Sequence, residues 1–210
     1  MSAATVAATE LARWRPRVSE ARPAVDPDRV EAAAAEFLEA LGLPLDSASM
    51  LETPGRMARA YTELLTVPEF DLTTFPNDEE YDELVLVENI PVHSLCEHHM
   101  LPFVGVAHIG YLPGQRIVGL SKFARLVEFH ARRAQTQERL TQEIAQHFRR
   151  RLEPRGVGVV IEAAHSCMSI RGARVPAART VTSALLGRLR DDPASRAEFL
   201  SLARPSREVR

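Results

Sequence analysis

The chain has little that marks a specialised class of protein. Its 210 residues include only two cysteines and one tryptophan, and 26 basic residues stand against 28 acidic ones. The resulting formal charge of -2 favours neither nucleic acid nor an anionic membrane as a partner, so any anion site must be built locally. No apolar run approaches the roughly 18 residues that span a bilayer. We therefore expect no nucleic-acid partner and no membrane partner.

The N-terminal stretch also lacks the features of a secretory signal. It has no long apolar core, and acidic Glu10 lies within it. We therefore expect a cytoplasmic protein whose thiols stay reduced. A hydrophobic content of 45% is enough for one substantial core.

Hydrophobic periodicity and breaker residues divide the chain into elements. Residues 1–25 show no sustained period and are expected to form a flexible arm. Helix caps are expected at Asp26, Thr53 and Ser121. The expected helices cover residues 26–42, 53–68, 121–130, 136–152 and 192–202. The expected strands cover 83–90, 103–112, 116–120 (a hairpin with the strand before it), 157–163, 167–171 (as a continuation or a lead-in) and 180–186, and 71–82 is expected to be a loop. This order predicts an α+β fold with an antiparallel sheet.

Both cysteines lie beside histidines, each just after a strand-like run. Cys96 precedes His98 and His99, and Cys167 follows His165 at a distance of two residues. Thiolate and imidazole are ligands that zinc prefers, and three protein ligands leave the fourth position open for water. The alternative is that each cysteine is a small buried hydrophobic residue. The neighbouring histidines favour a catalytic zinc held by Cys96, His99 and Cys167.

Two histidines remain at the edge of such a site. His165 shares a face of an extended chain with Cys167, and His98 points away from its neighbour His99. A near-neutral pKa suits a histidine side chain to proton transfer. The alternative for both is support of the metal ligands.

Cations gather where a helix is expected to start at Ser121. Lys122 and Arg125 would lie in its first turns, close to free backbone N–H groups, and this arrangement can grip a polyphosphate. An ordinary surface helix with solvated charges is the alternative, which this stretch alone slightly favours. The chain contains no Gly-x-x-x-x-Gly-Lys-[Ser/Thr] motif, so a phosphate-loop nucleotidase is not supported.

Gln137 and Glu138 precede a long helical pattern. A carboxylate beside an amide can accept N–H bonds from a guanine-like edge and read its carbonyl. An ordinary acidic first turn is the alternative, and it prevails without further context. Arg171, four residues after Cys167, can reach a phosphate from the metal side, but alone it is one of many arginines.

Taken together, these motifs resemble the GTP cyclohydrolase I family. The matching stretches occur in the family's order and at similar spacing over about residues 53–202: Cys96-Glu97-His98-His99 with Leu101-Pro102-Phe103, Gly119-Leu120-Ser121-Lys122, Gln137-Glu138-Arg139-Leu140-Thr141, His165-Ser166-Cys167-Met168, Arg171-Gly172 and Arg179-Thr180-Val181-Thr182-Ser183. Several separate motifs in agreement are more specific than any one of them. Given the resemblance, Lys122, Glu138 and Arg171 are expected to contact a substrate rather than to be ordinary surface residues.

The resemblance implies zinc-dependent hydrolysis of GTP to 7,8-dihydroneopterin triphosphate and formate, the entry to folate and related pterins. It places one Zn²⁺ per subunit on Cys96, His99 and Cys167. It also implies that His165 protonates a ring nitrogen, that His98 moves protons at the ribose, and that Ser121 assists the rearranging sugar. The implied substrate contacts are Glu138 and Gln137 for the guanine, and Lys122, Arg125, Arg171 and Arg56 for the triphosphate.

The family fold is the tunnelling fold, with helices packed on one face of an antiparallel sheet. The implied assembly is a toroidal homodecamer with active sites at subunit contacts, so a neighbouring chain can supply phosphate ligands. We divide the chain into an arm (1–25), an N-terminal helical region (26–68) and a catalytic tunnelling-fold domain (69–210).

Small departures from the family pattern occur at Ser166, where a larger residue is usual, and at Ala134, where proline is common. They bear on pocket shape and remove no ligand. Two other functions are also compatible with the sequence. One is a pterin or deazapurine enzyme of the same fold, such as a nitrile reductase, which would not need this His/Cys zinc set. The other is a non-catalytic nucleotide-binding or scaffold protein, which would have no use for an open zinc site flanked by histidines.

Overall fold

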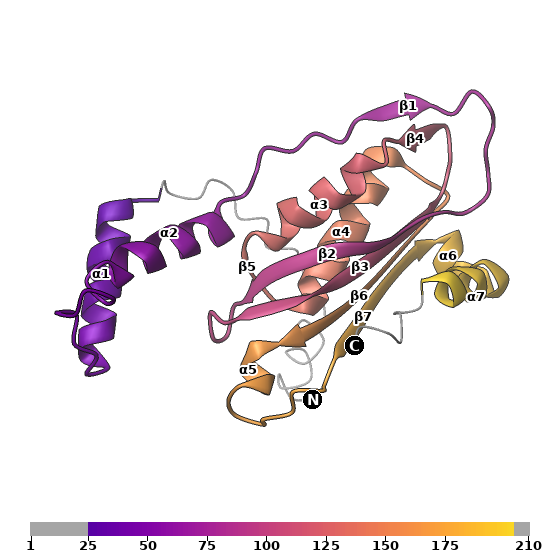
Figure 1. The fold of residues 1–210 in the computed structure, drawn as a ribbon. Coiled ribbons are helices and arrows are strands. Elements are labelled where there is room, and N and C mark those ends of the chain that lie inside the picture. Colours follow the sequence, from indigo (N-terminus) through magenta and orange to yellow (C-terminus); the bar gives the residue numbers. More distant parts are fainter. Residues whose placement is uncertain (1–24, 204–210) are drawn as a thin grey trace, which may run out of the picture.

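A five-stranded sheet organises the computed structural model, which describes residues 25–203 (Figure 1). The strand order is β5-β2-β3-β6-β7. Strands β2 (Val85–Cys96), β3 (Pro102–Leu112), β6 (Gly156–His165) and β7 (Thr180–Gly187) pair antiparallel in turn, and the short β5 (Ala134–Gln135) joins β2 in parallel. The predicted α+β class with an antiparallel sheet is confirmed. The arm predicted for residues 1–25 lies outside the described residues except for Val25.

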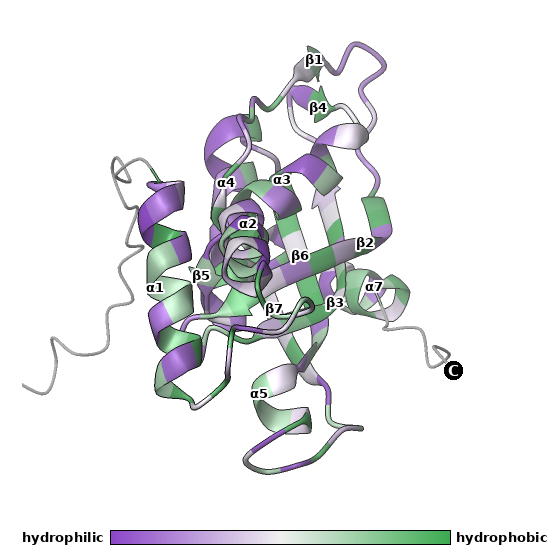
Figure 2. Ribbon diagram, turned by 60° about the vertical axis from the view of Figure 1, so that its left-hand side comes forward, coloured by the Kyte–Doolittle hydropathy of each residue, from purple (hydrophilic) through white to green (hydrophobic). Residues whose placement is uncertain are grey.

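Helices α3 (Ser121–Ala131) and α4 (Gln137–Leu152) cover one face of the sheet. Phe123 and Phe148 from these helices pack with Val159 and Ile161 of β6 in the main hydrophobic core. In Figure 2 the strands beneath the helices carry much of the hydrophobic colouring, as a covered sheet requires. Helix α4 is well specified locally, because Thr136 accepts the N–H of Arg139 at its start and basic residues follow in its last turn.

The opposite face is covered at one end by α6 (Arg188–Asp191) and α7 (Pro193–Leu202). Phe199 of α7 sits directly on two glycines of the sheet. A Cβ atom would lie 2.5 Å from the Phe199 ring at Gly158 and 2.9 Å from it at Gly110. The absence of side chains at Gly158 and Gly110 therefore leaves the space into which Phe199 of α7 packs.

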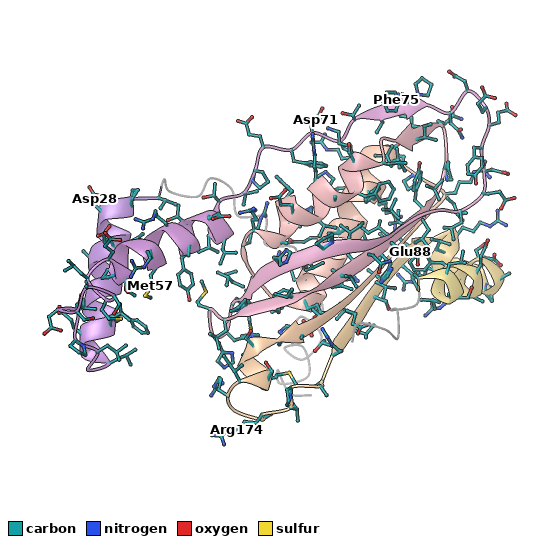
Figure 3. The ribbon with its side chains drawn as sticks, viewed as in Figure 1. Asp28, Met57, Asp71, Phe75, Glu88 and Arg174 are labelled. Carbon is teal, nitrogen blue, oxygen red and sulfur yellow. The ribbon has the colours of Figure 1, made fainter. Side chains whose placement is uncertain are left out.

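The helix pair α1 (Pro27–Ala40) and α2 (Thr53–Leu65) stands beside the sheet rather than on it; Figure 3 marks Met57 on α2. Asp26 caps α1 as predicted, by accepting the N–H of Arg29 at 3.1 Å. The caps predicted at Thr53 and Ser121 are wrong. These residues are the first within their helices, the cap positions are Glu52 and Leu120, and neither makes a side-chain cap bond.

Strand β2 continues six residues beyond the predicted end at Ile90 and so reaches Cys96. It passes a bulge between Val87 and Ile90, where Asn89 has a φ of 55°. Pro91 is tolerated because β2 is an edge strand at that point: its pairing with β5 involves only Leu95 and Cys96. The extension delivers Cys96 to the end of the sheet.

Two other predicted strands are corrected by the structure. Strand β4 (Arg116–Val118) pairs with β1 (Thr74–Pro76), inside the predicted loop 71–82, and not with β3. Both edges of β3 are already occupied by β2 and β6, so no hairpin partner is available there. The stretch after β6 forms the helical turn α5 (Ser166–Ser169) and no strand, because the pairing of β7 with β6 begins only at Thr180 opposite Ala163.

Within residues 25–203, no helix combines the length and apolarity needed to cross a bilayer.

Candidate metal centre

A tight turn after β2 folds His99 back over Cys96. The backbone N–H groups of Met100 and His99 donate to the carbonyl of Cys96 at 2.8 and 3.3 Å, and the N–H of Cys96 donates to the carbonyl of Leu101 at 2.8 Å. Met100 adopts a φ of 54° to close this turn. The loop between β2 and β3 is therefore built to present its side chains together.

Helix α5 brings the second cysteine to this loop. One ligand atom each from Cys96, His99 and Cys167 lie within 4.8 Å of one another, so this trio can hold a metal ion. His98 is not part of this group: its Nδ1 lies 3.7 Å from the Cys96 sulfur, and its ring stands at 77° to that of His99. The three residues expected to bind metal thus come together. His99 lies in this group and His98 lies outside it, as expected.

The neighbouring Cys96 disfavours a negative charge on the Cys167 sulfur. Burial raises the pKa of the Cys167 thiol, and the neighbouring Cys96 raises it further, against a smaller lowering by Arg171. A cation between two thiols and an imidazole reverses this effect, because it binds the deprotonated sulfur. Two sulfurs and one nitrogen are a donor set that suits zinc and other soft or borderline metals.

His165 is held from two sides next to the trio. Its Nε2 lies 2.8 Å from the side-chain oxygen of Gln137, and its ring stacks on Phe103 at 4.6 Å between centroids and 9° between planes. Burial lowers the pKa of His165, and the charge of Glu138 acts in the opposite direction. These contacts fix the orientation of the His165 ring, and burial makes its protonation less favourable than that of an exposed histidine.

Gln137 is itself fully engaged. It is 1% exposed, and its amide nitrogen donates to the carbonyls of Ile161 and Thr180, at 3.0 and 2.9 Å, and to the hydroxyl of Thr182 at 3.1 Å. These bonds fasten the start of α4 to β6 and β7. The residue holds His165 in place rather than offering free groups to a ligand.

These groups surround a cavity of about 220 Å³. Its lining comprises Cys96, His98, His99, Thr136, Gln137, Glu138, His165, Cys167, Met168 and Thr180. Glu138 is exposed and opens onto the cavity from the first turn of α4. The sequence had not assigned a role at the site to Thr136, Met168, Thr180 or the supporting Phe103. An aromatic residue two positions after Leu101, inside a matched motif, was the one available signal for Phe103.

Comparison with known proteins identifies the family. The sequence model of GTP cyclohydrolase I matches residues 30–204. The chain belongs to the GTP cyclohydrolase I family. It is similar to the GTP cyclohydrolase 1 of Mycobacteroides abscessus, with 55% identity covering 84% of this chain and 89% of the relative. The GTP cyclohydrolase 1 of Streptomyces griseus is 54% identical, with coverage of 85% and 91%.

A solved structure, that of the archaeosine synthase QueF-Like in the apo form, overlaps 50% of this chain and 93% of that chain, at 16% identity and a TM-score of 0.41.

The other residues expected at a GTP cyclohydrolase I site do not line the cavity. Ser121, Lys122 and Arg125 are at the start of α3, next to β1, where the N–H of Gly119 donates to the carbonyl of Thr73. The other end of α3 lies near residues 96–101, the turn after β2 that we call the metal loop, because the hydroxyl of Ser94 on β2 donates to the Ala131 carbonyl at 2.6 Å. A helix of 11 residues separates the two ends by about 15 Å. Neither Lys122 nor Arg125 is among the residues that line the cavity.

Of the two remaining arginines, Arg56 is bonded to other protein groups and Arg171 is exposed. Arg56 is engaged at the start of α2, where its guanidinium bonds the carboxylate of Glu52, the carbonyl of Ser49 and the hydroxyl of Thr53. Arg171 is exposed just after α5, and its charge acts on Cys167. The same loop carries Arg174, which Figure 3 marks at its outer tip.

Proposed function

We propose that this member of the GTP cyclohydrolase I family binds zinc and hydrolyses GTP to 7,8-dihydroneopterin triphosphate and formate. The observation that carries the proposal is the meeting of three metal-ligand atoms with His98, His165 and Glu138 around one cavity. The family membership supplies the substrate class, and the residues supply the chemistry.

Cys96, His99 and Cys167 would hold the zinc. Three protein ligands leave one tetrahedral position open, and the chemistry that zinc supplies there when bound is activation of water as a nucleophile for C8 of the purine. The residues around the site must therefore orient the purine ring and move its protons.

His165 would deliver a proton to a ring nitrogen of the purine. Its bond to Gln137 and its stacking on Phe103 keep the imidazole in one orientation, which a proton donor needs. Glu138 would recognise the guanine edge by accepting two N–H bonds. We assign Gln137 to holding His165 rather than to the guanine, because protein groups already occupy its amide.

The ribose would lie between the cavity and the triphosphate. His98, exposed on the cavity wall, would move protons at the opening sugar, and Ser121 would assist its rearrangement.

The triphosphate would be bound by Lys122, Arg125, Arg171 and Arg56, of which the first two come from a second copy of the chain. Two observations support a shared site: these cations lie at the far end of α3, and the cavity of about 220 Å³ is smaller than the roughly 300–1,000 Å³ of typical ligand pockets. A ring of identical subunits, ten in the proposed assembly, would place one chain's α3 against the next chain's cavity. Binding energy from the triphosphate then orients the purine at the metal.

A direct test uses purified protein loaded with zinc and supplied with GTP. We expect one formate per GTP and a product that becomes a fluorescent pterin on oxidation. Complete removal of zinc should abolish both signals, and restored zinc should return them. Full activity without zinc, or no product with zinc bound, would refute the proposal.

A further inference from the structure

Glu97 lies between Cys96 and His99 and yet takes no part in the cavity. Its carboxylate is turned toward α4, where it forms an ion pair with the guanidinium of Arg139. Its backbone N–H donates to the carbonyl of Gln135 at 3.0 Å. The metal loop is thus tied to the start of α4 through both the main chain and the side chain of one residue.

Arg139 is a fixed partner for this carboxylate. Its Nε donates to the side-chain oxygen of Gln135 at 2.8 Å, and the nitrogen that bonds Glu97 also donates to the carbonyl of Ala134 at 3.2 Å. The side chains of Arg139 and Glu97 are 22% and 33% exposed. A guanidinium held by several acceptors loses little further freedom when it binds a carboxylate, unlike a free surface pair.

The contacts of Arg139 continue through Gln135 into the protein interior. Gln135 is 1% exposed, and its amide nitrogen donates to the carboxylate of Glu143 at 2.9 Å and to the carbonyl of His130 at 3.0 Å. The chain of contacts therefore runs from the metal loop through Glu97, Arg139 and Gln135 to Glu143 on the buried side of α4. None of these four side chains lines the cavity.

We propose that Glu97 and Arg139 are positioning residues that hold the metal loop in register with Glu138. The loop carries Cys96 and His99, and Glu138 precedes Arg139 directly, so the pair sets the separation between the metal and the group that orients the purine. This inference rests on the proposed function for its catalytic consequence. Its consequence for metal binding is independent of GTP.

The test compares Glu97→Gln and Arg139→Gln, singly and together, with Glu128→Gln as the matched control. Glu128 pairs with Arg132 at 2.9 Å, and Arg132, 28% exposed, also bonds a backbone carbonyl, that of Glu63. Zinc affinity is measured by competition with a chromophoric chelator. In addition, kcat per zinc-loaded site and KM for GTP are measured with saturating zinc.

We expect each single variant to weaken zinc binding or lower kcat per zinc-loaded site by about tenfold or more. KM should change less than kcat, since the triphosphate contacts are untouched. The double variant should be no worse than the poorer single variant, and Glu97→Asp should recover part of the loss.

Values for both single variants within twofold of wild type, or losses that multiply in the double variant, would overturn the proposal. A loss of folded protein with normal kcat and zinc affinity per remaining site would also overturn it. If wild-type protein bound zinc but did not turn over GTP, the proposed function would fail, while the zinc-affinity comparison would still decide the role of Glu97.

Discussion

The Nε2 atom of His165 lies 2.8 Å from the side-chain oxygen of Gln137. The amide orientation of Gln137 follows from its surroundings, since its nitrogen faces the carbonyls of Ile161 and Thr180. Its oxygen must then accept a hydrogen bond, so His165 carries a proton on Nε2 when neutral. Nδ1 is left as the atom that would gain and lose a proton in the proposed reaction.

Replacement of Gln137 by leucine should therefore impair catalysis without removing any group that touches the metal. We expect kcat to fall by about 10- to 100-fold, because His165 loses its orienting acceptor. The acidic limb of the pH–rate profile should also move. Gln142→Leu, a partly buried position on the same helix, serves as the control and should keep both kcat and profile. An unchanged profile in Gln137→Leu would contradict the assigned tautomer.

Variants of the adjacent His98 and His99 should differ in their content of bound zinc. Cys167→Ser and His99→Ala each remove a member of the ligand trio, and we expect both to lose bound zinc and activity together. His98→Ala should retain zinc, because its ring lies outside the trio, but should lose about 100-fold or more in kcat. Mass-spectrometric metal analysis of the purified variants checks this directly. Loss of zinc in His98→Ala with retention in His99→Ala would reverse the assignment.

A shared active site predicts complementation between inactive variants. Lys122→Ala and Cys167→Ser each disable a different component, and the two components would meet only between subunits. Mixed and reassembled in equal amounts, they should recover about a quarter of wild-type activity. A site is intact only when one subunit supplies Cys167 and its neighbour supplies Lys122, and each condition is met in about half of the sites. Each variant reassembled alone is the control. No recovery in verified mixed oligomers would place Lys122 and Cys167 in the same site.

A pair of neighbouring histidines, of which His130 is buried and His147 partly exposed, should make folding sensitive to mild acid. His147 Nδ1 lies 3.2 Å from His130 Nε2, and His130 Nδ1 lies 3.4 Å from the Glu143 carboxylate. Burial, and then the charges of His130, Arg150, Arg151 and Arg133, lower the pKa of His147 to about 4. Burial also lowers the pKa of His130, despite Glu143.

The sign of the effect follows from which state binds more protons. Between the ordinary histidine pKa of 6.5 and about 4, the unfolded chain takes up protons that folded His147 does not, so stability is lost as the pH falls through this window. Because His147 is partly exposed, its share is discounted to about 1 kcal/mol, or about 2–4 °C in Tm. His147→Gln should reduce the Tm loss between pH 7 and pH 5 by this amount. Exposed His93→Gln should leave it unchanged.

Local signals in the sequence predicted most elements of the fold. Asp26 caps α1 through the expected bond, and the apolar stripe of α4 packs on the sheet as its period indicates. The caps predicted at Thr53 and Ser121 failed because a serine or threonine before an apolar run does not reveal which residue first adopts helical geometry. Errors of this kind shift a boundary and leave the element in place.

Residue chemistry also predicted the trio of candidate metal ligands, but not the residues that support it. Thiol and imidazole side chains are rare enough in this chain to be singled out, and the structure brings Cys96, His99 and Cys167 together. By contrast, Gln137 was expected beside the guanine, yet it bonds His165. Glu97 had no assigned role, yet it bonds Arg139. An amide or a carboxylate can serve either purpose, and only its neighbours decide which.

The chain's own pattern thus determined its class, its helices and the side-chain types of its candidate metal centre, because capping, periodicity and donor chemistry are properties of residues close in sequence. Only the tertiary structure decided the partner of β4, the helical turn that carries Cys167, and the passage of β2 through Pro91 to Cys96. The partner of β4 and the passage of β2 depend on which strand edges distant segments occupy or leave free. Edge occupancy is a property of the assembled sheet, and no local stretch of sequence contains it.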